Sequence, residues 1–265
     1  LLDLPEAASQ ADLAFAEAND FMLPPPRYSR LRRPIIGALP GAPPDLWRYS
    51  RRSLAELNQR AAQQGVTILA WTLNSDFAVA QSDWPLQFLY LRLGVAAAKQ
   101  LDARLLRVNL GGTADTPIGH DGRMVDRLAA FVNRVQRWCP GLQITVENHW
   151  GVSSDLDRHL RLFDAVAARL SAAQRAHFGC CFDPDNIPTG TKRRHWWAAL
   201  AARANHYHFK TTSERDNDLP HDELLALLDR NGYQGAATIE YQGQREILAG
   251  VRQSVALFRR LTASD

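Results

Sequence analysis

The chain contains 265 residues, of which 46% are hydrophobic and 22% are charged. These values are typical of a globular protein and exclude a disordered or fibrous chain. Lys and Arg together number 31 against 28 Asp and Glu, with no dense basic stripe, so the sequence predicts no nucleic-acid partner.

Short apolar segments alternate with amphipathic segments along the chain. In chain order, the predicted strands are residues 13–19, 66–74, 105–110, 142–147, 178–183, 205–210 and 236–241. The predicted helices are residues 47–64, 85–101, 122–138, 154–170, 191–204, 220–231 and 244–261. This alternation predicts βαβ units and a parallel sheet.

Seven strands in a chain of this length favour an α/β fold of the (β/α)8 TIM-barrel type over an open, doubly wound sheet. Residues 1–10 have the pattern of a helix, so we expect the first strand to be missing, either upstream of residue 1 or poorly formed. The Pro-rich stretch 24–44 is predicted to be a long loop rather than a linker. Residues 1–265 are therefore predicted to form a single domain.

The sequence carries no visible signal for export or for membrane insertion. No apolar run reaches the roughly 18 residues that a membrane-spanning helix needs, and no basic segment leads into an apolar one at the start. The cysteines, Cys139, Cys180 and Cys181, form no C-x-x-C motif and no disulfide framework. We therefore expect a cytoplasmic protein with no membrane partner.

Side chains alternate between apolar and polar along the predicted strands. In the sixth strand, Tyr207 and Phe209 occupy one face. His206, His208 and Lys210 occupy the other face. Because successive side chains of a strand point in opposite directions, the apolar faces should pack on helices and the polar faces should point into the barrel. The polar groups should then gather at its C-terminal mouth, where barrel enzymes have their active sites.

Four residues lie at or near the C-terminal ends of four successive predicted strands: Glu147, Asp183, His208 and Glu240. Three carboxylates brought together in a partly buried site repel one another, so a positive group must lie among them. Three oxygen ligands and one imidazole suit Mn²⁺, Mg²⁺ or Co²⁺, with Zn²⁺ as an alternative. The competing interpretation is that these acids are surface residues or ion-pair partners of nearby Lys and Arg side chains.

Five stretches of the sequence resemble the xylose isomerase-like barrels, the family of sugar phosphate isomerases and epimerases. They are A-K-Q-L-D-A-R-L-L-R-V-N-L-G-G (98–112), I-T-V-E-N-H (144–149), F-D-P-D-N (182–186), H-Y-H-F-K (206–210) and G-Y-Q-G-A-A-T-I-E-Y (232–241). Relatives in this family include ketose 3-epimerases, inosose dehydratase and endonuclease IV. The chain departs from the ketose 3-epimerases at Asn186, where they have His, and at Ser153, where an acid is usual.

The resemblance implies that Glu147, Asp183, His208 and Glu240 bind one divalent metal ion and that the two glutamates act as acid and base. The implied reaction is sugar isomerisation or epimerisation, in which a proton leaves the carbon next to a carbonyl and the metal stabilises the enediolate. The residues predicted to contact the sugar or to lie behind the site are His149, Lys210, Asn186, Arg107, Asn109 and His206. The resemblance also allows a homo-oligomer.

Three other functions stay open at this stage. A dehydratase or keto-glycoside lyase could use the same four ligands and then expel a leaving group. An AP endonuclease resembles the chain at Glu147, Asp183 and Glu240, but it needs three metals and more histidines, whereas the strands here end in Asn74 and Asn109. A barrel without activity would gain nothing by keeping all four ligands.

Overall fold

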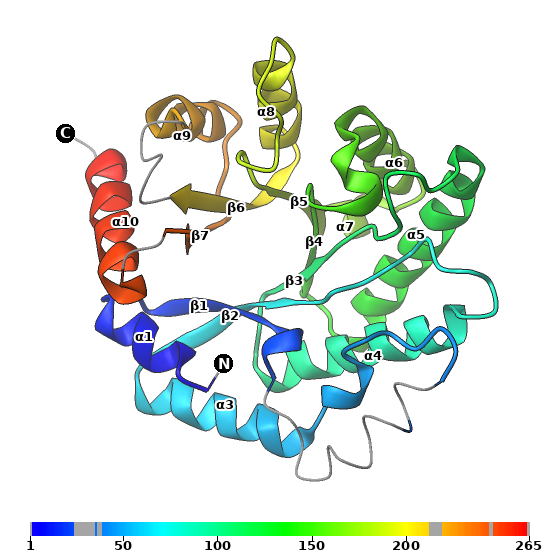
Figure 1. The fold of residues 1–265 in the computed structure, drawn as a ribbon, viewed down its shortest axis with the longest axis horizontal. Coiled ribbons are helices and arrows are strands. Elements are labelled where there is room, and N and C mark those ends of the chain that lie inside the picture. The colour runs from blue at the N-terminus through cyan, green and yellow to red at the C-terminus, as the bar shows by residue number, and fades with distance from the viewer. Residues whose placement is uncertain (1, 24–34, 36–38, 212–218, 244–245, 264–265) are drawn as a thin grey trace.

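Seven parallel strands form a nearly closed barrel surrounded by helices in the computed structural model (Figure 1). It describes residues 2–23, 35, 39–211, 219–243 and 246–263. The strands are β1 (Phe15–Asn19), β2 (Thr67–Thr72), β3 (Leu105–Val108), β4 (Gln143–Glu147), β5 (Phe178–Phe182), β6 (Ala204–Thr211) and β7 (Ala236–Tyr241). Each strand pairs in parallel with the next along the chain. The predicted TIM-barrel fold is confirmed.

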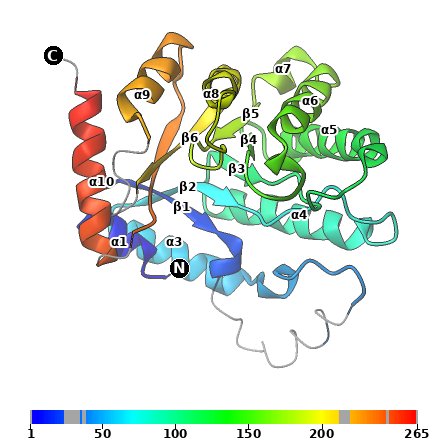
Figure 2. The same cartoon turned by 45° about the horizontal axis from the view of Figure 1, so that its top comes forward.

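Helices connect the strands and cover the outside of the barrel (Figures 1 and 2). They are α1 (Leu4–Gln10), α3 (Arg51–Gln63), α4 (Trp84–Gln100), α5 (Asp121–Trp138), α6 (Leu156–Ala168), α7 (Ala172–Arg175), α8 (Arg193–Ala201), α9 (His221–Arg230) and α10 (Ile247–Thr262). The helix predicted from residue 47 begins later because Ser50 has extended backbone angles and a 3₁₀ turn, η2 (Leu46–Arg48), precedes it. The short helix α7, which begins with a capping box at Ser171, was not predicted.

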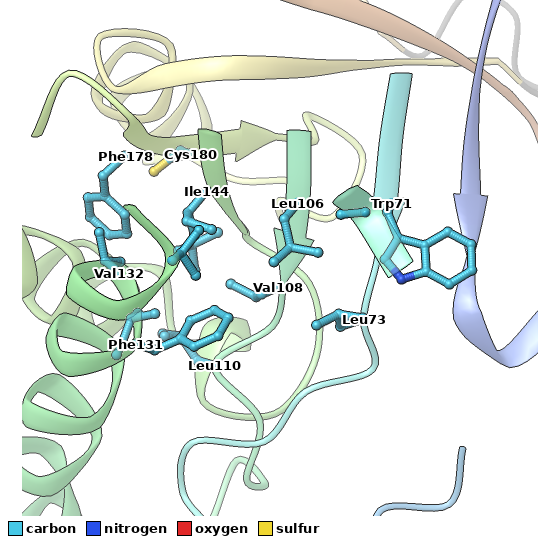
Figure 3. Close-up of a cluster of buried hydrophobic side chains, with 14 of the residues drawn as sticks. Trp71, Leu73, Leu106, Val108, Leu110, Phe131, Val132, Ile144, Phe178 and Cys180 are labelled. Carbon is cyan, nitrogen blue, oxygen red and sulfur yellow. The ribbon is translucent and has the colours of Figure 1, made fainter. Parts of the chain in front are cut away.

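Apolar side chains on the outer faces of the strands form the core between the sheet and the helices. Figure 3 shows part of this cluster, with strand residues packed against Phe131 and Val132 of α5. Cys180 belongs to it and is fully buried. The neighbouring Cys181 has the opposite strand parity and faces the barrel interior. The outer face therefore supplies the hydrophobic stabilisation and leaves the inner face for polar groups.

The barrel is open between its first and last strands. The sheet order begins at β1 and ends at β7, so these two strands are the edges of the sheet. A cavity of about 480 Å³ lies between them, lined mainly by apolar residues of α1, β1, β7 and α10. Outside it, α10 lies beside the α1–β1 connection (Figures 1 and 2), where Arg259 donates hydrogen bonds to the carboxylate and carbonyl of Asp12 at 2.7 Å. Glu17 on β1 accepts a hydrogen bond from Thr238 on β7 at 2.9 Å, which joins the two edges from inside.

Part of the predicted 24–44 loop lies outside the described residues, namely 24–34 and 36–38. Among the helices that the structure describes, none has the length and apolar character that a bilayer crossing requires.

Asp20, in the 3₁₀ turn η1 (Asp20–Met22) directly after β1, is a buried carboxyl group near the mouth of the barrel. The Tyr49 hydroxyl donates a hydrogen bond to its Oδ2 at 3.0 Å, and the Tyr90 hydroxyl donates to the same oxygen. Its Oδ1 has no hydrogen-bond partner. Burial raises the pKa of Asp20 to about 7, so the folded chain favours the protonated acid.

We expect the free energy of unfolding to fall with rising pH because of Asp20. The carboxyl group of Asp20 loses its proton near pH 3.8 in the unfolded chain but keeps it until pH is about 7 in the folded chain. The contribution of Asp20 to the free energy of unfolding is therefore greatest at low pH and is lost as the pH rises from about 4 to about 7. Relative to an Asp20→Asn variant, the parent should lose about 3 kcal/mol between pH 5 and 8. Urea unfolding of both proteins at these pH values measures the difference, and parallel pH profiles would contradict it.

Candidate metal centre

His208 of β6 lies at the centre of the polar interior. Its Nδ1 is 3.4 Å from Glu147 Oε1, 3.6 Å from Asp183 Oδ2 and 3.2 Å from Glu240 Oε2. This nitrogen is buried and has no hydrogen-bond partner among the described residues. The structure therefore brings the four residues named from the sequence to one point, where a ring nitrogen faces three carboxylates.

The other nitrogen of His208 is occupied by Glu17 of β1. His208 Nε2 lies 3.3 Å from Glu17 Oε2 and donates a hydrogen bond to it. Burial lowers the pKa of His208, but Glu17 and Asp183 outweigh burial and raise it well above its ordinary value, so without a metal both ring nitrogens carry a proton. Because Glu17 accepts the proton on Nε2, Nδ1 is the nitrogen that could exchange its proton for a metal ion. A carboxylate behind a ligating imidazole is the usual arrangement in metal sites, because it orients the ring and raises its basicity.

Each of the three carboxylates at the site is held by further contacts. Asp183 lies 2.7 Å from Lys210 Nζ and accepts a hydrogen bond from Asn186 Nδ2 at 3.0 Å. Glu147 pairs with Arg107. Glu240 accepts a hydrogen bond from Gln242 Nε2 at 2.8 Å and lies 3.6 Å from Lys210. The positions of the oxygens are thus fixed before any ligand binds.

The balance of charge fits a divalent cation. Among the residues that the structure describes, the four carboxylates of Glu17, Glu147, Asp183 and Glu240 face two permanent cations, Arg107 and Lys210. Two negative charges are left when His208 is neutral. The ligand atoms of Glu147, Asp183 and His208 also lie within 4.8 Å of one another. The unpartnered Nδ1, the oxygen-rich donor set and the excess charge together fit an ion such as Mn²⁺, Mg²⁺ or Co²⁺.

Neighbouring positive charges keep Asp183 and Glu240 ionised. Burial raises the pKa of Asp183, but its contacts with His208 and Lys210 outweigh burial and bring the pKa well below its usual value. The pKa of Glu240 is lowered in the same way, by His208 and Lys210 against burial. Ionised carboxylates can bind a metal ion or accept a proton from a substrate.

A cavity of about 440 Å³ opens above the site, a size suited to a small ligand. The predicted residues Arg107, Asn109, Glu147, His149, His208 and Glu240 line it. His149 is exposed, and the buried amide oxygen of Asn109 has no partner. Lys210, Asn186 and His206 are not among the described residues that line this cavity: Lys210 and Asn186 contact Asp183, and His206 lies deeper, bonded to Thr238 at 2.7 Å.

The residue missed by sequence reasoning is Glu17. Its Oε1 accepts hydrogen bonds from Arg107 Nε at 2.6 Å and from Thr72 Oγ1 at 2.7 Å, while its Oε2 faces His208. The signal was available, because Phe15, Glu17 and Asn19 alternate with three alanines in the first predicted strand. That alternation places Glu17 on the inward face.

Comparison with known proteins agrees with this fold. A family model described as xylose isomerase-like TIM barrel matches residues 36–261. No curated protein matches the chain. A solved structure of D-psicose 3-epimerase in the presence of D-fructose is 11% identical with a TM-score of 0.70, over 99% of this chain and 94% of that one.

Two further solved structures share the fold. A xylose isomerase-like TIM barrel protein from Mycobacterium smegmatis, in complex with magnesium, is 11% identical with a TM-score of 0.69, over 98% of this chain and 87% of that one. The probable 3-DHS dehydratase AsbF from Bacillus anthracis is 12% identical with a TM-score of 0.66, over 97% of this chain and 92% of that one. Since the family model matches most of its length, the chain belongs to the xylose isomerase-like TIM barrel family.

Proposed function

We propose that this protein is a divalent-metal-dependent isomerase or epimerase that acts on a small sugar in the cytoplasm. The observation that carries the proposal is the unpartnered Nδ1 of His208, which faces three carboxylates at the base of an open cavity. Glu147, Asp183, His208 and Glu240 would hold one ion of Mn²⁺, Mg²⁺ or Co²⁺, with Zn²⁺ as the alternative. Neither a nucleic acid nor a membrane is proposed as a partner.

The two glutamates are placed to move protons on a bound keto sugar. A divalent ion at this site would polarise the sugar carbonyl and stabilise negative charge on the neighbouring oxygens. Glu147 and Glu240 come from β4 and β7 and both line the cavity. One would accept the proton from the carbon next to the carbonyl, and the other would supply the proton that replaces it. His149 and Asn109 lie where they could bind sugar hydroxyls.

A second candidate reaction, dehydration or elimination of a keto-glycoside, is favoured by Lys210. Its ammonium group lies 2.7 Å from Asp183 and 3.6 Å from Glu240, within the same cluster. Lys210 itself does not line the cavity, so its proton could reach a departing oxygen only through Glu240, which does line it, after the carbon next to the ketone has lost its proton. Measuring released leaving group beside deuterium uptake from D₂O in a panel of ketoses separates the two reactions.

The metal content of the purified protein tests the proposal first. Protein prepared without a chelator should contain about one equivalent of Mn, Co, Mg or Zn by plasma mass spectrometry, and an Asp183→Ala variant should retain at least about tenfold less. The matched control is Asp185→Ala, because Asp185 is exposed and only its backbone N–H contacts Asp183. Absence of metal from the parent even after incubation with Mn²⁺ would refute the metal site.

A further inference from the structure

We propose that Cys181, His206 and His208 form a second metal site, directly beneath the carboxylate site, that binds thiophilic ions such as Zn²⁺ or Cd²⁺ and competes with the first site for His208. This site goes beyond the proposed function, since isomerisation or epimerisation does not use Cys181 or His206 as ligands. Only the competition for His208 depends on the first site.

The strand register places these three residues in one group. Cys181 of β5 is aligned with His206 of β6. Cys181 lies two residues before Asp183, and His206 lies two residues before His208, so both pairs share the inward face of their strands. Cys181 and His206 therefore lie one inward-facing position before Asp183 and His208 on their strands, and Glu147 of β4 is aligned with Cys181. Sγ of Cys181 and one ring nitrogen from each histidine lie within 4.8 Å of one another.

Unpartnered nitrogens point to a ligand in this buried group. Cys181 and His206 are fully buried, and His208 is 2% exposed. His206 uses Nε2 to contact Thr238 Oγ1 at 2.7 Å. In the part of the chain that the structure describes, neither its Nδ1 nor Nδ1 of His208 has a hydrogen-bond partner. Two buried imidazole nitrogens without partners are costly, and a bound cation would satisfy both.

The donor atoms of the two sites select different ions. The upper site offers carboxylate oxygens and one nitrogen, which suit hard ions such as Mn²⁺ and Mg²⁺. The lower site offers a thiol and two imidazoles, which suit Zn²⁺ and Cd²⁺ once the thiol proton has been displaced to solvent. Glu17, Thr238 and His208 line the open cavity, so an ion can approach the lower site from the same mouth.

The two sites cannot both be filled. Glu17 occupies Nε2 of His208, so each ion must bind the remaining nitrogen, Nδ1. Two divalent ions a few ångströms apart would also repel each other strongly. A thiophilic ion should therefore pull His208 away from the carboxylates and release a hard ion already bound there.

The test uses metal-free protein in a phosphine reductant, titrated with Cd²⁺ while the near-ultraviolet thiolate-to-cadmium absorption is recorded. The parent should bind about one equivalent with this absorption. Cys181→Ala should lose the absorption and bind Cd²⁺ on the order of 100-fold more weakly. Cys180→Ala is the matched control, because Cys180 is equally buried but packs in the outer core, and it should behave as the parent. Thermal melting curves of both variants verify that they fold.

Competition is measured by loading the parent with Mn²⁺ and following free Mn²⁺ by electron paramagnetic resonance as Cd²⁺ is added. One equivalent of Cd²⁺ should release the Mn²⁺ from the parent and from Cys180→Ala, but not from Cys181→Ala. Asp183→Ala should lose Mn²⁺ yet keep the thiolate absorption, which separates failure of the upper site from failure of the lower one. A parent without thiolate absorption, or an absorption unchanged in Cys181→Ala, would overturn the site. Simultaneous binding of Cd²⁺ and Mn²⁺ would overturn the competition.

Discussion

Glu240→Gln is expected to slow the proposed epimerisation, measured on whichever ketose of the panel the parent converts, by about 100- to 10,000-fold. This is the range that a positioned acid–base group contributes. The substitution keeps an amide oxygen near the proposed metal site but removes the carboxylate that we propose accepts a proton. Because both directions of the reaction pass through the same intermediate, the forward and reverse rates should fall together. Glu223→Gln, in an exposed surface ion pair with Arg194, is the isosteric control and should keep parental rates.

The isotope pattern distinguishes a proton-transfer role for Glu240 from a role in metal binding alone. If Glu147 serves the other face of the sugar, Glu240→Gln should still exchange deuterium from D₂O into one epimer, without inversion. It should exchange none into the other epimer. Nuclear magnetic resonance of each epimer incubated separately measures this asymmetry. Equal loss of exchange from both epimers, with metal content retained, would contradict the assignment of one glutamate to each face.

His208 and the three carboxylates around its Nδ1 could be predicted because each of these four residues stands at or near the end of a strand with the same parity. Strand ends are readable from the sequence, and the C-terminal ends of parallel strands meet at one edge. That rule also placed His206 inward, as the structure has it. The alternation of side chains along a strand, however, predicts only which side chains point into the barrel. It does not predict how far along the barrel axis each one lies. The register between β5 and β6 is what places His206 beside Cys181.

Contacts that depend on side-chain reach could not be predicted from the sequence. Arg107 was expected near the substrate because it points inward. Arg107 lines the cavity, and its guanidinium also extends to both Glu17 and Glu147, residues 90 and 40 positions away in the sequence. Lys210 likewise lies against Asp183. A long, flexible side chain can select among several partners, and only the packing of neighbouring strands decides which one it meets.

Helix boundaries show a similar limit. The periodicity of residues 47–64 is continuous, yet the extended backbone at Ser50 interrupts it and α3 begins only at Arg51. The open barrel was predictable from the count of strands, because a helical pattern occupies the residues before β1. How the edges are joined was not, since it depends on Glu17 reaching Thr238 across the gap.

Arg107→Met is expected to lower the free energy of unfolding by about 3–5 kcal/mol when measured in a chelator, the usual result of removing one partner from a buried ion pair. The Arg107 guanidinium lies between Glu17 and Glu147 and also contacts Thr72 at 3.0 Å. Burial lowers the pKa of the guanidinium, but the two carboxylates outweigh burial and raise it above its ordinary value. Without Arg107, both carboxylates lose their main counter-charge inside the barrel.

Urea unfolding of Arg107→Met beside Arg203→Met tests this expectation. Arg203 pairs with Asp164 at 2.8 Å on the surface, where side-chain exposures of 30% and 54% allow water to screen the charges. Arg203→Met should therefore lower the free energy of unfolding by less than about 1 kcal/mol. A divalent ion at the upper site would supply part of the missing positive charge, so adding Mn²⁺ should reduce the deficit of Arg107→Met more than that of Arg203→Met. Equal losses in the two variants would show that Glu17 and Glu147 do not need Arg107 as their counter-charge.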